Sequence, residues 1–304
     1  MNIATPPDLP ANLPAKMPES IAAELGRPVR LKTWSLIVSV FGDAILPRGG
    51  SISAASLGEI MTVMGVEAGA VRTAISRLAA DGWIERHREG RASFYRLAPQ
   101  REAEFRRAAR RIYAGPAHRP GKQGESWGDW VLVCQPQEAG DTALPEGAIR
   151  LTREWFLIDL AGIDPAAGEA PGADAMVYRG AFVQKPDWFL KLVAPPSEAA
   201  AMAHLLAVFA PLEAVIRDQG VPRPLEALAL RCLLIHGWRR IALRLSGLPQ
   251  GLLPEDWPEA ECREGVARLY RQLLEPSEAW LSDAARCEMG RLPAASTDLF
   301  ERFS

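Results

Sequence analysis

The amino-acid sequence predicts an α+β protein in three parts: a basic N-terminal part with helices and two strands, a small mixed middle part, and a helical C-terminal part. Three observations lead to this prediction. Residues 56–97 show two short helical patterns separated by Gly65 and then two strand-like runs. Residues 127–195 are rich in β-forming side chains, and beyond residue 197 apolar side chains recur at helical spacing.

The chain begins with a proline-rich segment. Five prolines fall within the first 20 residues, and no apolar run typical of a signal peptide is present. We therefore predict a disordered tail over residues 1–30. The next segment, 33–50, predicts a helix that Pro47, Gly49 and Gly50 bring to an end.

Two further helices follow. Ser56 and Glu59 match a capping box, which predicts a short helix from residue 56 to about 64. Gly65-Val66 is expected to make the turn into a third helix over 67–81. Gly82 then takes the position favoured for a left-handed helix cap.

Residues 83–88 and 92–97 read as two strands around Glu89-Gly90-Arg91, which predicts a hairpin. Helix, helix, turn, helix and hairpin is the order of a winged helix-turn-helix domain, which we assign to residues 31–98.

The remaining segments are assigned from composition and periodicity. Residues 99–125 are expected to hold an arginine-rich helix, 101–115, and a linker. The middle domain, 126–196, is predicted to be α+β, with strands at 127–136, 175–184 and 187–195. Its segment 149–162 suits either a strand or a buried helix. The C-terminal domain, 197–304, is predicted to be all helical, with a long buried helix at 224–245 and helices near 266–274 and 278–289.

The charges are distributed unevenly. Residues 1–124 hold 18 Lys and Arg against 11 Asp and Glu, whereas the rest of the chain holds 17 against 26. A basic end on an acidic body indicates that this end meets a polyanion.

The third helix and the hairpin carry the candidate binding residues. Val71, Ala74, Ile75 and Leu78 share one helix face, so the opposite face is either merely solvated or in contact with a partner. Cations crowd the hairpin tip close to that face, which favours double-stranded DNA as the partner, read in the major groove by arginine. The predicted DNA-binding residues are Arg72, Thr73, Ser76, Arg77, Arg86, His87, Arg88, Arg91 and Ser93.

Neither a metal site nor a disulfide is expected. The four cysteines and four histidines are scattered without ligand spacing, as in a protein of the reducing cytoplasm, and no cofactor is predicted. No apolar run approaches the roughly 20 residues of a membrane span. A metal-dependent nuclease stays an alternative class, since Asp129, Asp159, Asp164 and Asp187 are conceivable ligands.

Three separated segments resemble the PaaX family, the repressors of phenylacetic acid degradation operons. They are SLIVSVFGDAILPRGG, VRTAISRLAADGWIERHREGRASFYRL, and LLIHGWRRIALR with the downstream LPQGLLPEDWPEAECREGVARLYRQLL. The resemblance runs over residues 34–292. It implies a winged helix, a ferredoxin-like central domain similar to the CRISPR spacer-acquisition nuclease subunit, and a helical C-terminal domain. It also implies a homodimer that represses transcription until an aryl-acyl-CoA effector, such as phenylacetyl-CoA, binds. A regulator of another pathway, with a different acyl-CoA or acting as an activator, is the alternative within this class.

An acyl-CoA effector needs a cavity beside fixed cations. The candidate effector-binding residues are His236, Trp238, Arg239, Arg240 and Arg244. Alternatively, these arginines pair with the acid-rich stretch 254–265 and the tryptophan fills the core, or the group forms a domain joint that responds to the effector. The dimer contact is expected in the C-terminal region, with helix 101–115 as a further candidate.

Overall fold

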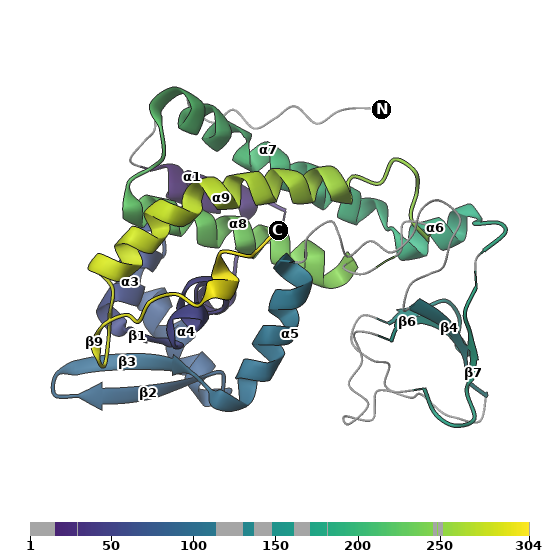
Figure 1. Ribbon diagram of the computed structural model, residues 1–304, viewed down its shortest axis with the longest axis horizontal. Coiled ribbons are helices and arrows are strands. Elements are labelled where there is room, and N and C mark those ends of the chain that lie inside the picture. The colour runs from purple at the N-terminus through teal and green to yellow at the C-terminus, as the bar shows by residue number, and fades with distance from the viewer. Residues whose placement is uncertain are drawn as a thin grey trace.

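The structure is a computed structural model that describes residues 16–28, 30–113, 130–136, 148–160, 171–180, 182–245, 248 and 252–303. It is α+β, as predicted. The long helices α7, α8 and α9 lie together above α3 and α4, and the sheet that contains β4, β6 and β7 stands apart from them (Figure 1).

The helices are α1 Met17–Leu25, α2 Thr33–Val40, α3 Ala54–Val63, α4 Ala68–Ala80, α5 Glu102–Tyr113, α6 Asp187–Val193, α7 Pro196–Gln219, α8 Pro224–Leu245 and α9 Glu259–Asp283. The strands are β1 Ser51–Ser53, β2 Ile84–Glu89, β3 Ala92–Leu97, β4 Trp130–Cys134, β5 Ile149–Arg150, β6 Trp155–Asp159, β7 Met176–Tyr178, β8 Arg286–Cys287 and β9 Gly290–Arg291. They form antiparallel sheets in the orders β1-β3-β2, β5-β6-β4-β7 and β8-β9.

The expectation of a disordered tail through residue 30 is wrong for residues 17–25, which form α1. Ile21 and Leu25 lie one turn apart on this helix and are buried, and α1 contacts α7 and α8. Burial of this apolar face accounts for the helix despite the prolines nearby. Residues 1–15 lie outside the described residues.

The predicted helix 33–50 is confirmed as a chain of helical turns. α2 continues through a π-helical turn, Phe41–Ile45, and a 3-10 turn, Leu46–Arg48. It ends at Gly49, whose φ of 87° is strained for any residue with a β-carbon.

The predicted capping box is wrong, and the helix begins two residues earlier than expected. Ser53 is the cap: its Oγ accepts a hydrogen bond of 3.1 Å from the backbone N–H of Ser56. Ser56 itself lies inside α3, where its Oγ accepts from the backbone N–H of Arg286 at 3.1 Å. Because β1 directly precedes the helix, the serine that ends this strand is the one placed to cap.

The third helix and the hairpin are confirmed. α4 and the β2–β3 hairpin (hereafter the hairpin) have nearly the predicted bounds. Gly65, Gly82 and Gly90 adopt positive φ values of 77°, 68° and 57° at the three turns where the pattern required them.

Two predictions for the middle part are wrong. Among the described residues, the strand expected over 175–184 is limited to β7, Met176–Tyr178, and the strand expected over 187–195 is absent. The ambiguous segment forms the strand β6, but residues 187–193 form the helix α6 instead of a strand. Helical spacing buries Phe189 together with Val193, and Asp187 favours the positive N-terminal end of the helix dipole. This packing outweighs the β propensity of the aromatic and β-branched residues.

The C-terminal helices follow the prediction except at one point. α8 has the predicted bounds, whereas the two helices expected near 266–274 and 278–289 are one helix, α9, which ends at Asp283. Pro276 lies inside it without breaking it, and the hydroxyl of Ser277 donates to the carbonyl of Leu273. The following residues 286–291 form the β8–β9 hairpin, so the prediction of an all-helical C-terminal domain is wrong at this point.

One hydrophobic core unites the N-terminal and C-terminal helices. It contains buried side chains of α1 to α5 and of α7 to α9, and α8 contacts α1, α2, α3, α5, α7 and α9. Smaller clusters hold the β4–β7 sheet and α6 together. Among the described helices α7 alone is long and apolar enough to cross a membrane, and its Met202, Leu205, Val208, Phe209 and Leu212 pack in the common core.

Charged side chains also lie inside this core. Arg231 of α8 is fully buried and donates to Asp43 and Glu278, in both cases at 2.8 Å. Asp43 also pairs with Arg302, and Glu278 pairs with Arg48. These five residues, hereafter the buried charge network, join the segment after α2 to α8, α9 and the last described turn.

Candidate nucleic-acid interface

α4 is positioned by its apolar face. Val71, Ala74, Ile75 and Leu78 are buried in the common core, and α4 contacts α2, α3 and β2. This packing fixes which side chains remain on the surface.

The opposite face of α4 is exposed over its whole length. Its predicted residues Arg72, Thr73, Ser76 and Arg77 are all exposed, and we call them the outer face. Nε of Arg77 lies 3.6 Å from a carboxylate oxygen of Asp81, and the hydroxyl of Thr73 donates back to the carbonyl of Gly69 at 3.1 Å. An exposed pair of this kind is worth little, so Arg77 can exchange it for a better acceptor.

The hairpin presents its polar residues on two different faces. Arg86 and Arg88 face the same side as Ser93, because they lie two and four residues after Ile84 on one strand face and pair across the strands with Tyr95 and Ser93. A guanidinium nitrogen of Arg86 donates to Ser93 Oγ at 2.9 Å.

His87 lies on the other face of the hairpin, in line with Glu85 and Glu89. The structure thus separates His87 from Arg86 and Arg88, which the sequence had grouped. Arg91 occupies the turn and is exposed.

The base of the hairpin is tied to the C-terminal segment, a contact that the sequence analysis missed. Glu288 pairs with Arg96 of β3 and accepts a hydrogen bond from the hydroxyl of Ser51 in β1. Burial alone would raise the pKa of the Glu288 carboxyl, but the bonds from Ser51 and Arg96 prevail and hold this pKa below its usual value. Since 192 residues separate Arg96 from Glu288, no local sequence pattern reveals the contact.

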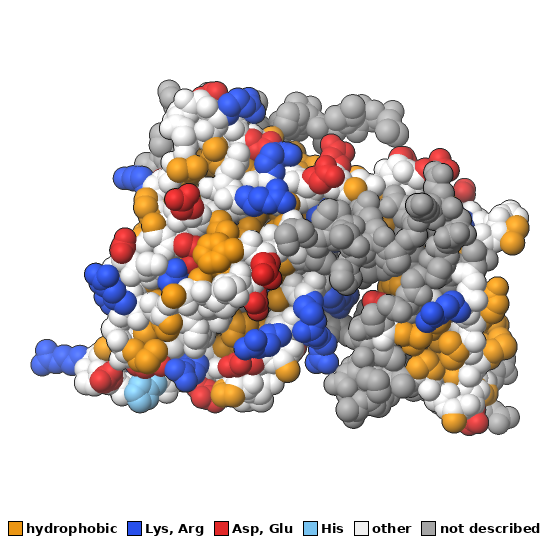
Figure 2. Space-filling view, in the orientation of Figure 1, with side chains coloured by type: hydrophobic (Ala, Val, Ile, Leu, Met, Phe, Trp, Pro, Cys, Tyr) orange, Lys and Arg blue, Asp and Glu red, His pale blue; other side chains and the backbone are white. Residues whose placement is uncertain are grey.

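Basic side chains continue beyond the hairpin. In Figure 2, blue side chains protrude at the tip of the hairpin and gather again around α5. Arg106, Arg107 and Arg110 are exposed on α5, whose Phe105 and Ile112 are buried.

Four of the five predicted effector-binding residues contact the core or neighbouring helices. His236 is buried, with Nδ1 2.9 Å from Ser39 Oγ, and burial, followed by the charges of Arg239 and Arg240, lowers its pKa to about 3. Trp238 is a core residue whose indole N–H donates to the carbonyl of Ile112 at 2.8 Å.

The arginines of this group bind neighbouring helices. Arg239 donates to the carbonyl and hydroxyl oxygens of Ser35 in α2, and burial lowers its pKa to about 10, with a further contribution from Arg240. Arg244 pairs with Glu198 of α7 at 2.7 Å. The expected pairing of these arginines with the stretch 254–265 is not seen, whereas the expectation that the tryptophan fills the core is confirmed. The residues lie at the joint where α8 meets α2, α5 and α7.

Metal ligands do not cluster in the described parts of the chain, where no group of three or more His, Cys, Asp or Glu side chains could hold an ion. Asp159 ends β6 and Asp187 begins α6. The other two candidate aspartates, Asp129 and Asp164, lie outside the described residues.

Comparison with known proteins gives three matches. The family model "PaaX-like protein" matches residues 32–101, and the model "PaaX-like protein C-terminal domain" matches residues 198–283. The chain is also 28% identical over 291 residues to the transcriptional repressor PaaX of Escherichia coli (strain K12), covering 88% of this chain and 89% of that protein. The first model covers α2 to β3 with the outer face and the hairpin, and the second covers α7, α8 and α9.

Proposed function

The chain belongs to the PaaX family, and we propose that it is a DNA-binding transcriptional repressor of a phenylacetate catabolic operon. We further propose that an aryl-acyl-CoA such as phenylacetyl-CoA relieves the repression. We also propose that the protein acts as a homodimer.

The observation that carries the DNA-binding part is the fully exposed outer face of α4. Four side chains that can donate hydrogen bonds stand on the side of the helix that the core does not use. We propose that α3, its turn and α4 form a helix-turn-helix with the hairpin as its wing. The outer face would enter the major groove, and the hairpin arginines would contact phosphates.

The ferredoxin-like fold of the middle part remains a prediction. The strand order β5-β6-β4-β7 agrees with a split βαβ arrangement, whereas β4 and β6 are antiparallel and that arrangement pairs its central strands in parallel.

Fluorescence anisotropy on labelled duplexes tests the proposal. The promoter region of a phenylacetate operon should bind far more tightly than an unrelated duplex at the same salt concentration. Phenylacetyl-CoA should release it, and free phenylacetate, which lacks the anionic nucleotide, should not. Equal affinity for both duplexes would contradict a specific repressor.

A regulator of another pathway is the second candidate. It keeps the same DNA-binding residues and differs only in the acyl-CoA that releases the DNA. Replacing phenylacetyl-CoA by a panel of aryl- and alkyl-CoAs in the same titration separates the two. Incubating the protein with plasmid and Mg²⁺ or Mn²⁺ tests the nuclease alternative, since cut plasmid would show an enzyme.

A homodimer in the cytoplasm completes the proposed function. One helix-turn-helix reads one half-site, and specific repressors present two of them related by a twofold axis. We expect the C-terminal helices, with α5 as a further candidate, to form the contact between the two subunits.

A further inference from the structure

A cavity lies where the small middle unit meets the C-terminal helices. It has a volume of about 250 Å³ and is bounded by Leu190 of α6, Pro196 and Ala199 of α7, and Pro254, Trp257 and Pro258 of the segment before α9. None of these residues belongs to the predicted DNA-binding or effector-binding residues.

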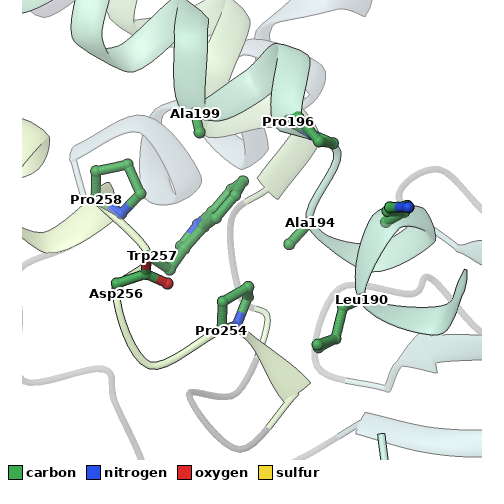
Figure 3. A pocket seen from close by; sticks show the side chains of 9 residues that line it. Leu190, Ala194, Pro196, Ala199, Pro254, Asp256, Trp257 and Pro258 are labelled. Atoms are coloured by element: carbon green, nitrogen blue, oxygen red, sulfur yellow. The ribbon is translucent and has the colours of Figure 1, made fainter. Parts of the chain in front are cut away.

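The walls of the cavity are mostly apolar and stiff, and its charged lining residues are Lys191 and Asp256. Figure 3 shows the indole of Trp257 extending toward Ala199 and Pro196, with Ala194 and Pro254 on one side of the ring. Proline rings and an indole have few rotatable bonds, so a flat apolar group binds between them with little loss of side-chain entropy.

Trp257 presents its ring, and not its N–H, to the cavity. Its Nε1 is buried away from solvent, so an occupant contacts the face of the indole. Packing against an aromatic face suits a flat apolar group.

The volume limits what can enter. A cavity of about 150 Å³ accommodates benzene, whereas pockets that enclose a drug-sized ligand measure about 300–1,000 Å³. A phenylacetyl group therefore fits, and a complete coenzyme A thioester does not. Lys191 lines the same cavity and is exposed, so it offers an ammonium group to an anionic part that stays outside.

On these grounds, and resting on the proposed function, we propose that this cavity binds the aryl-acyl end of the effector. The ring lies against Trp257 and the prolines, and the nucleotide lies outside the cavity near Lys191.

The position of the cavity explains how its occupant acts on the DNA-binding part. Trp257 packs both against the cluster of the middle unit and against the common core. Glu198, next to Ala199, pairs with Arg244 of α8, and α8 contacts α2. An occupant that prefers one arrangement of this joint shifts the DNA-binding equilibrium by its difference in affinity for the two arrangements.

Two substitutions on α7 form a matched test. The side chain of Ala199 lines the cavity, whereas that of Ala200 is exposed. Ala199→Phe fills the space proposed for the acyl group, and Ala200→Phe makes the same change outside it.

Isothermal titration of the full chain with phenylacetyl-CoA and with CoA alone gives the readout. For phenylacetyl-CoA we expect Ala199→Phe to raise the Kd about tenfold or more and Ala200→Phe to change it less than about twofold. Binding of CoA alone and affinity for operator DNA without effector should stay unchanged in both variants. Trp257→Ala, which removes the aromatic wall, should also weaken phenylacetyl-CoA binding, and it serves as the test if Ala199→Phe does not fold.

The outcomes separate this inference from the proposed function. If wild type and the cavity variants bind phenylacetyl-CoA equally and release operator DNA at the same concentration, the cavity is not the site and the repressor function stands. If the wild type binds operator DNA but no acyl-CoA, both the proposed effector and this inference are wrong.

Discussion

Individual arginines of the interface have different surroundings in the free protein. Arg77 stands on a rigid helix and is held near Asp81, whereas Arg91 lies in the turn of the hairpin, where no ion pair with another described residue involves it. A side chain on a helix is held in one direction and can discriminate bases, while one at a turn acts mainly through its charge.

Arg77→Ala should therefore cost about 1–3 kcal/mol of operator binding and relax sequence specificity. Anisotropy on operator variants with single base changes measures both effects. Arg217→Ala, an exposed arginine on α7, is the control and should change neither. Unchanged affinity and specificity in Arg77→Ala would remove this residue from the interface.

Arg91→Ala should weaken binding to all duplexes alike. Loss of one phosphate contact should reduce the slope of log affinity against log salt concentration by about one. A titration series from low to moderate salt measures that slope, and a change confined to one sequence would contradict the assignment.

His236 links stability to pH. Its pKa is lowered to about 3 by burial and by Arg239 and Arg240, so the folded protein holds it neutral. An unfolded chain binds a proton at this residue below pH about 6.5, so its contribution to stability is present above that pH and is lost as the pH falls toward 3.

Urea unfolding at several pH values tests this linkage. Between pH 6.5 and 3 the wild type should lose up to about 1.4 kcal/mol per pH unit more than His236→Asn, which keeps a polar group near Ser39 but does not titrate. Identical pH profiles for the two proteins would show that His236 binds its proton equally well in the folded and unfolded states, so that burial does not lower its pKa.

Among the helices and strands, local sequence patterns correctly predict those elements whose buried face is determined by their own residues. The period of Val71, Ala74, Ile75 and Leu78 was enough to predict α4 and its exposed face, and the turn glycines fixed its ends. The sequence was insufficient to predict the start of a helix that depends on contacts with a distant part of the chain. Ser53 caps α3 because β1 pairs with β3, some 40 residues later in the chain.

The candidate site was likewise predictable only where it depends on local sequence patterns. The outer face follows from helical periodicity, and the two faces of the hairpin follow once its register is known. The tie of Arg96 to Glu288 and the cavity at Trp257 depend on segments that meet only in the folded chain. The spacing of residues along the sequence does not predict contacts of this kind.

The tie between β3 and the C-terminal segment gives a prediction of its own. Glu288→Gln removes the charge that holds Arg96 and weakens the acceptor for Ser51, so hydrogen exchange in residues 84–97 should become faster. Mass spectrometry of exchanged peptides measures this. Glu59→Gln, an exposed change on α3, is the control, and unaltered exchange in the hairpin of Glu288→Gln would show that the tie has no stabilising role.

For the molecule as a whole, the buried charge network makes the N-terminal and C-terminal parts one unit. Arg231→Met leaves Glu278 and Asp43 with fewer cations in a dry interior, which should cost about 3–5 kcal/mol in the free energy of unfolding. Arg268→Ala, which breaks the exposed pair with Glu213, should cost about 0–1 kcal/mol. Urea unfolding measures both, and equal losses would show that the network does not join the two parts.

Assembly is also a property of the whole molecule. We expect light scattering to give the mass of a dimer at micromolar concentration and two chains on one imperfect inverted repeat. A single chain both free and on DNA would contradict the proposed repressor assembly.

The buried position of Asp43 has a consequence for how the protein is made. Tyr113, which donates to Asp43, follows 70 residues later, whereas the cations and the second tyrosine that bind it, Arg231, Tyr270 and Arg302, follow 188, 227 and 259 residues later. A ribosome delivers the N-terminal helices first, at about 5–20 residues per second, so for many seconds this carboxylate has none of these later partners to compensate its burial. The core of the N-terminal helices includes α8 and α9, so it can be completed only after these helices have left the exit tunnel. A polypeptide that a premature stop codon ends before α8 would lack most of this core, so it would be a substrate for proteases and not a competitor for the operator.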